Sequence, residues 1–313
     1  MKMDFCMERV SFLTTIACNL NCKLCAASSP YRAGEAGFSL EENKNVLDKF
    51  FQTVDYVKKF SIGGGEPLLW TSFPDFLKYL HKYSAQFGKL EIITNGTLVP
   101  KVELLEAAKL FGDQVFFLID HYGNDISVNV SAMESLFTAH GIPYKTRGNM
   151  AGNSHCNGWV DFSDGSALLH NTQKEVEKVF SKCAQAQKMN FCFIIWRGIM
   201  YPCDQVRKCI DRGTTPANPN EYIALLAPNL SVKDLQDKIE NLYHVKSLAA
   251  CAYCNGMCED SERFVPAEQL TKEEIECVKR GARSYREVCI MMNSDKEHPT
   301  PPPVIDRVIV FEL

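Results

Sequence analysis

Three cysteines on one short stretch carry the clearest chemical signal in this sequence. Cys18, Cys22 and Cys25 lie in TTIACNLNCKLC, at the end of the apolar run VSFLTTI. A structural zinc site needs four closed ligands, and a self-contained iron–sulfur cluster also needs four thiolates. Three thiolates on a 4Fe-4S cluster leave one iron open to a small molecule. Three thiols therefore suit a cluster only if another molecule binds the remaining iron.

A glycine-rich segment offers groups that could hold such a ligand. The segment is SIGGGEP, residues 61–67, which overlaps the end of the apolar-rich run VKKFSI. Glycines such as Gly64 and Gly65 let the backbone come close to a ligand, and the carboxylate of Glu66 can accept an ammonium group. A glycine-rich turn alone is more often only a turn, so this segment gains its meaning from its position after a second strand-like run.

Further strand-like runs also end in polar residues. KLEIITNGT leads into Thr94 and Asn95, QVFFLID ends in Asp120, and Arg147 lies at the end of the next run. In a parallel barrel the carboxyl ends of the strands form the active-site side. These side chains are therefore candidates for binding a cofactor or substrate.

In this order, the motifs CxxxCxxC, GGEP and Thr-Asn-Gly resemble those of the radical SAM superfamily, with a resemblance that covers residues 10–147. The resemblance implies a 4Fe-4S cluster on Cys18, Cys22 and Cys25, with S-adenosylmethionine (SAM) on the free iron. It also implies a flavodoxin- or ferredoxin-type electron donor.

The same resemblance assigns residues to SAM itself. The GGEP motif grips the methionyl end of SAM in that family, while Asp120 would hydrogen-bond the ribose or serve as a catalytic residue in the substrate pocket. Arg147 would pair with the SAM carboxylate or remain a solvated strand end. Leu24 replaces the aromatic residue that the family commonly carries before the third cysteine, so we expect backbone contacts to adenine with weaker stacking. The implied SAM-binding residues are Leu24, Gly64, Gly65, Glu66, Thr94, Asn95, Asp120 and Arg147.

A second set of cysteines lies in the later half of the chain. Cys192, Gly198 and Cys203 match the cysteine, gap, Gly-x4-Cys element of the SPASM and twitch subfamilies, and CAYCNGMC matches the start of their CxxC element. The resemblance implies one auxiliary 4Fe-4S cluster, and a zinc ribbon or knuckle is the alternative because CxxC pairs are common in zinc sites. The implied ligands are Cys192, Cys203, Cys251 and Cys254, with Cys258 as a substitute for one of them.

Cys209 is a candidate catalytic thiol. It lies between the second and third implied auxiliary ligands, where a cysteine of twitch-type epimerases can return a hydrogen atom to the substrate radical. An ordinary semi-buried thiol is the alternative. The remaining cysteines have weaker cases as functional residues: Cys156, Cys183, Cys277 and Cys289. Cys277 and Cys289 lie at or near a helix predicted over 271–288 and are assigned to packing.

Composition agrees with a cytoplasmic enzyme. The chain has 313 residues, 46% hydrophobic content and a formal net charge of -4, so it can bury a sizeable core. No stripe of Lys and Arg indicates nucleic-acid binding, and no apolar stretch approaches membrane-spanning length. Fourteen cysteines in a reducing compartment favour metal binding over disulfides.

Alternating apolar runs and amphipathic segments predict an α/β fold with a parallel sheet. The resemblance extends this to a partial (β/α)6 TIM-like barrel with a small C-terminal twitch/SPASM-like cluster-binding domain. The predicted domains are 1–185 for the barrel, 186–290 for the auxiliary cluster and 291–313 for a Pro-rich linker and a last strand. Strands are predicted near 10–16, 57–62, 89–94, 114–119 and 142–147, and helices near 40–55, 73–86, 100–111, 129–140 and 173–188.

The predicted function is hydrogen-atom abstraction from a small polar substrate after reductive cleavage of SAM to a 5′-deoxyadenosyl radical. The substrate would be a sugar, an aminocyclitol or a nucleotide-linked sugar, and the outcome epimerisation or oxidation. Modification of a ribosomal peptide is the runner-up, less favoured because only seventeen residues precede the first cluster cysteine. A non-catalytic iron–sulfur electron carrier or a zinc-stabilised binding module is the alternative from another class, but neither has a use for GGGEP.

Overall fold

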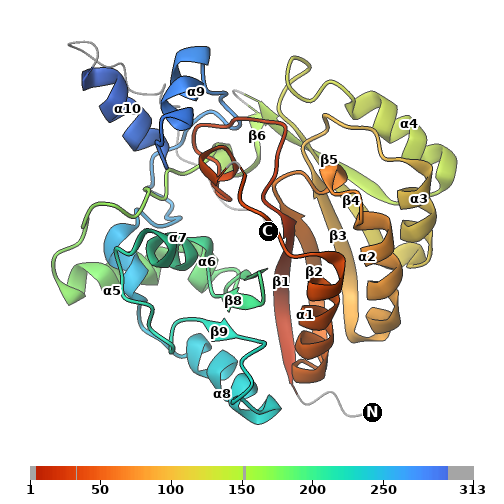
Figure 1. Ribbon diagram of the computed structural model, residues 1–313, viewed down its shortest axis with the longest axis horizontal. Coiled ribbons are helices and arrows are strands. Elements are labelled where there is room, and N and C mark those ends of the chain that lie inside the picture. The colour runs from red at the N-terminus through yellow and green to blue at the C-terminus, as the bar shows by residue number, and fades with distance from the viewer. Residues whose placement is uncertain (1–4, 33, 151–152, 295–313) are drawn as a thin grey trace.

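One parallel-rich sheet organises the fold. The computed structural model describes residues 5–32, 34–150 and 153–294, and its strands follow the order β6-β5-β4-β3-β2-β1-β7-β8-β9 (Figure 1). Neighbours from β5 through β1 to β7 are parallel, whereas β6, β8 and β9 join antiparallel. The predicted α/β class is confirmed.

Strands and helices alternate through the first half, as the sequence predicts. The strands are β1 Cys6–Thr15, β2 Tyr56–Gly64, β3 Phe87–Thr94, β4 Val115–His121 and β5 Tyr144–Met150, and the helices are α1 Leu40–Thr53, α2 Phe73–Leu80, α3 Val102–Lys109 and α4 Val130–His140. Figure 1 shows α1 and α2 side by side along the sheet.

Phenylalanines fill the space between the sheet and the helices α1 and α2. Phe12 of β1, Phe60 of β2 and Phe76 of α2 are fully buried, and the ring centroids of Phe12 and Phe76 are 5.3 Å apart. Each such burial contributes roughly 1.5–3 kcal/mol, so this core fixes how β1, β2 and α2 lie against one another. It thereby also fixes the position of the loops that follow β1 and β2.

The later half extends the same sheet. Strand β7 pairs in parallel with β1, with Val10 opposite Phe193, so the hydrogen-bonded ladder crosses the predicted boundary at residue 185. The elements are β6 Asn153–Ser154, α5 Gln173–Lys182, α6 Ala184–Gln187, β7 Phe193–Trp196, β8 Ile199–Tyr201, α7 Asp204–Arg212, β9 Ile223–Ala224, α8 Val232–Tyr243, α9 Lys272–Lys279 and α10 Tyr285–Ser294. Short 3-10 turns lie at Ser29–Arg32, Pro67–Leu69, His81–Gln86, Gly112–Gln114, His155–Asn157 and Ala249–Tyr253.

Local capping explains where several helices begin. At α1 the Ser39 hydroxyl accepts from the Glu42 amide while the Glu42 carboxylate accepts from the Ser39 amide, a reciprocal capping box. The same device starts three later helices, through Thr172 and Glu175 in α5, Ser231 and Asp234 in α8, and Thr271 and Glu274 in α9.

Some predicted elements differ in extent. The single helix predicted over 271–288 is two helices, α9 and α10, because the chain turns at Gly281, whose φ of +110° no helix accommodates. The helix predicted over 173–188 is interrupted at Cys183, which has extended backbone. Residues 291–294 belong to α10 and not to the predicted linker, and the rest of that linker and the last predicted strand lie outside the described residues.

Within the described ranges, no helix combines the length and apolar character needed to cross a lipid bilayer.

Candidate active site

The ends of β1, β2 and β3 bring together residues from the three predicted motifs. The Asn95 backbone N–H donates to Glu66 Oε2 at 2.8 Å, and the Thr94 hydroxyl donates to Glu66 Oε1 at 3.0 Å. The Asn95 side-chain amide donates to Asn19 Oδ1 at 3.1 Å and lies 3.7 Å from Cys18 Sγ. Residues far apart in sequence therefore form one contact network.

Glu66 is fully buried at the centre of this network. Besides its contacts to Thr94 and Asn95, its carboxylate accepts from the Leu68 backbone N–H at 3.1 Å. Burial raises the pKa of the Glu66 carboxyl to about 7, although the three hydrogen bonds act in the opposite direction. A cationic group placed against this carboxylate would stabilise its ionised form.

Gly64 and Gly65 allow two backbone segments to approach each other. A Cβ at Gly65 would lie 2.1 Å from the Ala17 carbonyl oxygen, and one at Gly64 would lie 2.2 Å from that of Thr15. Hydrogen bonds from the Gly65 and Glu66 amides to Thr15 and Ala17 join GGGEP directly to the cysteine loop. The sequence analysis attributed these glycines to ligand contact, whereas the contacts seen here are between backbones.

The cysteine loop supplies a donor set suited to an iron–sulfur cluster. Cys18, Cys22 and Cys25 are free thiols, and their charges act on one another. Burial raises the pKa of Cys18 to about 11 and raises that of Cys22 further, so a positively charged metal centre is needed to hold them as thiolates. Among the described residues, no three His, Cys, Asp or Glu side chains converge closely enough for a single metal ion. A cluster distributes its thiolates over separate irons, so the donor set fits that group.

Asp120 and Arg147 are partners of each other. They lie in register on β4 and β5, and the Arg147 guanidinium donates to both Asp120 carboxylate oxygens, at 2.6 and 2.8 Å. The Asn149 side chain adds a third hydrogen bond to Asp120 at 2.8 Å. Asp120 is buried, and its charge is among those that act on Glu66, so the pair adjoins the Glu66 network.

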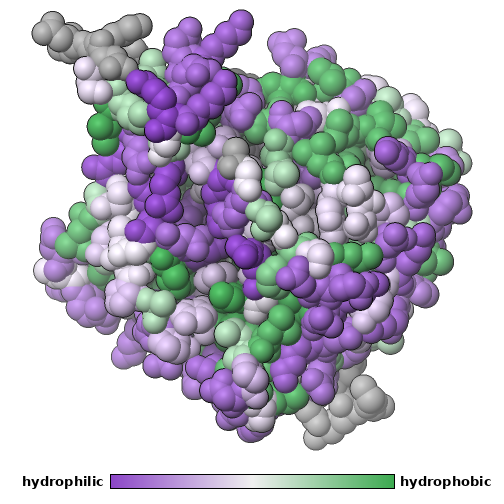
Figure 2. Space-filling model, viewed as in Figure 1, coloured by the Kyte–Doolittle hydropathy of each residue, from purple (hydrophilic) through white to green (hydrophobic). Residues whose placement is uncertain are grey.

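A cavity of about 850 Å³ adjoins the cysteine loop. Leu24 and Cys25 border it, and residues of α7 and α10 line other parts of its wall. Figure 2 shows hydrophilic residues around a hollow near the middle of this face of the molecule. The charged residues on the wall are Lys23, Arg32, Arg207, Lys208, Arg212, Arg283 and Arg286, together with Glu35, Asp161, Asp164 and Asp211.

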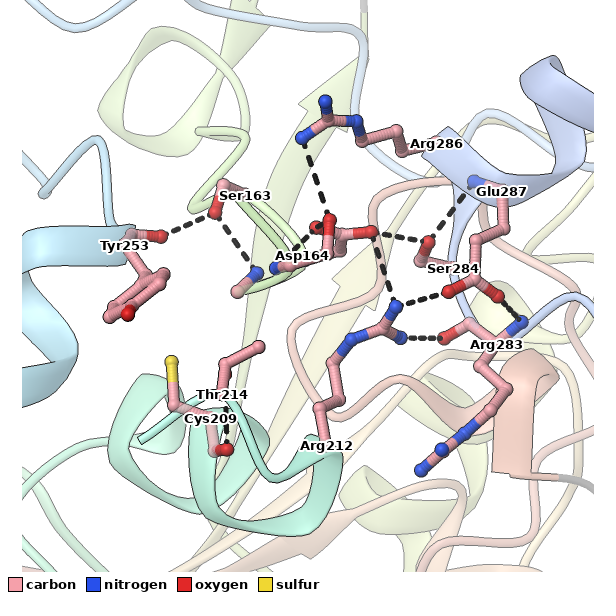
Figure 3. Close-up of polar contacts among 12 residues, drawn as sticks. Ser163, Asp164, Cys209, Arg212, Thr214, Tyr253, Arg283, Ser284, Arg286 and Glu287 are labelled. Atoms are coloured by element: carbon pink, nitrogen blue, oxygen red, sulfur yellow. Dashed lines mark hydrogen bonds and ion pairs between the residues drawn. The ribbon is translucent and has the colours of Figure 1, made fainter. Parts of the chain in front are cut away.

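Ion pairs order part of this wall. Arg212 contacts both Asp164 and Glu287, and Ser284 donates to Asp164 at 2.7 Å (Figure 3). Hydrogen bonding from Ser166 and Ser284 and the charge of Arg212 outweigh burial and lower the pKa of the Asp164 carboxyl. The wall is thus a preorganised set of charges suited to a polar molecule.

Four thiols of the later half meet at a second, smaller cavity. Cys183, Cys203, Cys251 and Cys254 all line it. Burial raises the pKa of Cys251 to about 12, and the other three thiols are among the groups whose charges act on Cys254. Backbone amides of Gly256 and Met257 lie 3.2 Å from Cys254 Sγ and 3.5 Å from Cys183 Sγ.

Cys192 is not in this group. The charged groups that act on its thiol are Arg9, Lys59 and Glu91, on the first three strands. Cys258 lies beside the Val179 carbonyl and near Cys183 but does not line the small cavity. Cys183, which has a weaker case from the sequence, lines the small cavity, whereas Cys192 does not.

The Cys209 thiol is enclosed by protein. It is fully buried on α7, a Cβ added at Gly165 would lie 2.9 Å from its sulfur, and the Gln205 amide lies 3.9 Å away. It does not line the larger cavity, whereas Cys289 does. Cys277 is buried between α9 and α10, as predicted for a packing residue.

Comparison with known proteins identifies the first half. Residues 12–133 match the model of the Radical SAM superfamily. A GTP 3′,8-cyclase of Helicobacter pylori (strain ATCC 700392 / 26695) is 33% identical over 135 residues, which is 42% of this chain and 40% of that protein. The GTP 3′,8-cyclase of strain HPAG1 is 36% identical over 100 residues, 31% of this chain and 30% of that protein. The chain spans less than half the length of these curated relatives.

One solved structure shows a likeness of fold. BtrN, in complex with AdoMet and 2-DOIA, is similar with a TM-score of 0.51 and 15% identity over 84% of this chain and 98% of that chain. SuiB of Streptococcus suis gives a TM-score of 0.34 and 18% identity over 46% of this chain and 33% of that chain. The match to the family model covers the cysteine loop, GGGEP and the Thr-Asn-Gly turn. Residues 12–133 therefore form a radical SAM superfamily domain, and that family implies a 4Fe-4S cluster and SAM as cofactors.

Proposed function

We propose that this radical SAM enzyme abstracts a hydrogen atom from a small polar substrate such as a sugar, an aminocyclitol or a nucleotide-linked sugar. The observation that carries the proposal is the cavity of about 850 Å³, which has Leu24 and Cys25 on its wall together with eleven charged side chains. Its size suits a small molecule, and its polar wall suits one with many hydroxyl or charged groups. The name of the Helicobacter relatives agrees with a nucleotide-like substrate.

The residues of the first half bind and orient the cofactor in this proposal. Cys18, Cys22 and Cys25 hold the cluster, and Glu66 accepts the SAM ammonium group. SAM bound at the reduced cluster supplies the 5′-deoxyadenosyl radical that removes the hydrogen atom. Further contacts come from backbone at Gly64, Gly65 and Leu24, from Thr94 and Asn95, and from the pair Asp120 and Arg147. A flavodoxin- or ferredoxin-type protein supplies the electron.

We also propose an auxiliary 4Fe-4S cluster on Cys183, Cys203, Cys251 and Cys254, in a small twitch-like domain. The support is that these four thiols line one cavity. Zinc on the same four thiols is the alternative, and the metal content of the protein distinguishes the two. Cys183 precedes the predicted domain boundary at 185, so we place that boundary before Cys183.

Substrate oxidation is the outcome that this arrangement favours. An auxiliary cluster can accept the electron of the substrate radical, whereas the Cys209 thiol is buried against Gly165 and does not line the substrate cavity. Oxidation would make the product two mass units lighter than the substrate, while epimerisation would leave its mass unchanged.

The test begins with the reconstituted protein, SAM and a strong reductant. We expect about eight irons per chain and formation of 5′-deoxyadenosine. Cys22→Ala should abolish that product and lose about half of the iron. An intact iron content without any 5′-deoxyadenosine would favour the electron-carrier alternative.

A matched pair of variants tests the auxiliary site. Cys183→Ala should lose iron while keeping the absorbance of the first cluster. Cys192→Ala should keep the full iron content of the wild-type protein. The reverse result would restore the assignment of Cys192, and zinc in place of the second half of the iron would refute the auxiliary cluster.

A further inference from the structure

A segment near the C-terminal end of the described chain lies across the cluster loop. Leu270 donates its backbone N–H to the Asn21 carbonyl at 2.8 Å, and Lys23 donates its own to the Glu268 carbonyl at 2.8 Å. These bonds make an antiparallel bridge between Cys22 and Gln269. We call residues 267–270 the strap. It holds the middle of the loop that carries Cys18, Cys22 and Cys25.

The Gln269 side chain binds the loop with both ends of its amide. Its Oε1 accepts from the Asn21 backbone N–H at 2.8 Å, and its Nε2 lies 3.3 Å from Cys22 Sγ, within hydrogen-bonding distance for sulfur. The same Nε2 donates to the Ala267 carbonyl at 2.6 Å, which fixes the direction of the amide. Ala267 is fully buried and has a φ of +54°, an uncommon conformation for a residue with a side chain.

Charge contacts hold the strap independently of Gln269. Lys23 Nζ lies 2.7 Å from Glu268 and 3.4 Å from Glu274, and Tyr31 donates its hydroxyl to the Lys23 carbonyl at 2.7 Å. The Lys23 side chain is only 10% exposed, so these ion pairs are partly screened from solvent. A change at Gln269 alone should therefore leave the strap in place.

We propose that Gln269 is a positioning residue that sets the electronic environment of the cluster sulfur at Cys22. An N–H group directed at a cluster thiolate stabilises the extra negative charge of the reduced state, so it raises the reduction potential. The oxygen end of the same amide orders the loop at Asn21. This inference rests on the proposed cluster at Cys18, Cys22 and Cys25, but the loop-ordering part concerns the protein alone.

The first measurement uses the cluster-free protein. Gln269→Leu removes the acceptor for Asn21, so amide hydrogen exchange in the loop should become roughly two- to tenfold faster. Gln236→Leu is the matched control, because Gln236 donates a similar part-buried hydrogen bond to the Thr53 carbonyl at 2.9 Å, far from the loop. Unchanged exchange in Gln269→Leu would refute the ordering role.

The second measurement uses reconstituted protein and an EPR-monitored redox titration. Gln269→Leu and Gln269→Glu should both shift the first cluster to lower potential, with the larger shift for the glutamate because it adds a negative charge. Gln269→Glu keeps an acceptor for the Asn21 N–H. A lower cluster potential in this variant, without faster amide hydrogen exchange in the loop, would therefore separate the electronic effect of Gln269 from its effect on loop order. Wild-type potentials in both variants would refute the inference.

The two proposals fail in different ways. Wild-type protein that forms the cluster but makes no 5′-deoxyadenosine would refute the proposed function and leave Gln269 testable by its potential. Normal 5′-deoxyadenosine formation with no effect of Gln269 on potential or exchange would refute only the present inference.

Discussion

Glu66 shows how burial and function are linked at a single residue. The carboxyl is enclosed by the end of β3 and by its own turn, and burial raises its pKa to about 7. The ligand-free protein therefore holds Glu66 largely protonated below pH 7, whereas binding an ammonium group requires the ionised form. Binding and proton release are coupled for this reason.

We predict that SAM affinity increases as the pH rises through 7, and that binding below pH 7 releases a proton. Calorimetry in two buffers of different ionisation enthalpy measures the release. Glu66→Gln should bind SAM without releasing a proton. Its affinity for SAM should fall about ten- to a hundredfold, because a hydrogen bond to a charged group contributes roughly 1.5–3 kcal/mol. Glu91→Gln is the control, since Glu91 is also a buried glutamate but lies within β3 and accepts a hydrogen bond from Ser61. A Glu66→Gln protein that binds SAM like wild type would overturn the assignment.

Substitutions at neighbouring glycines of GGGEP should differ in their effect on stability. Gly65→Ala should destabilise the cluster-free protein by about 1–3 kcal/mol or more, because its Cβ would lie 2.1 Å from a backbone oxygen that cannot move away. Gly63→Ala should stay within about 1 kcal/mol of wild type, since the nearest atom to its Cβ is 3.9 Å away. Urea unfolding measures both. Equal losses would mean that the close approach of GGGEP to the cysteine loop is wrong.

At the scale of elements, local sequence predicts the first half well and the later half less well. The strands near Phe60 and Ile92 and the helices between them have regular apolar periodicity and clear caps, so their type and order follow from the sequence. The break at Gly281 depends on one residue with positive φ, which periodicity does not detect. The grouping of Cys183 with Cys254 and the bridge from Cys22 to Gln269 depend on tertiary contacts with no fixed spacing.

The link between α7 and the cluster loop illustrates such a contact. Arg207 is fully buried, pairs with Asp204 at 2.7 Å and Asp211 at 3.3 Å, and donates to the Ala27 carbonyl at 3.2 Å. We predict that Arg207→Met destabilises the cluster-free protein by up to about 3–5 kcal/mol, because it removes the closer ion-pair partner of the buried Asp204 and leaves it with Lys208 at 3.5 Å.

Two further variants complete that test by urea unfolding. Lys233→Met removes an exposed ion pair on α8 and should cost no more than about 0.5 kcal/mol. Arg207→Met combined with Asp204→Leu should recover much of the loss, since the buried carboxylate is removed together with its closest partner. A single Arg207→Met variant as stable as Lys233→Met would show that the pair does not hold α7 to the loop.

On the scale of the whole molecule, the two predicted domains share one core. A continuous cluster of buried apolar residues runs from Met7 to Ala250 and includes side chains from both sides of residue 185. The sheet passes through it, because β7 pairs directly with β1. Helix α8 also contacts α1, where Gln236 donates to Thr53. These contacts join the later half to the strand that leads into the cysteine loop.

A shared core and sheet predict one cooperative unfolding transition for the cluster-free protein, even though chains of this length often unfold in several steps. Trp70 reports on the first half, where it packs on Phe76, and Trp196 lies buried on β7. Two variants that each keep only one of these tryptophans, with Trp159→Phe in both, should give the same urea midpoint by fluorescence. Midpoints that differ, with Trp196 lost first, would instead mean that the later half folds as a separate domain on a finished first half. Coincident midpoints would mean that the two halves unfold together, as expected when β7 and β1 share one sheet and one core.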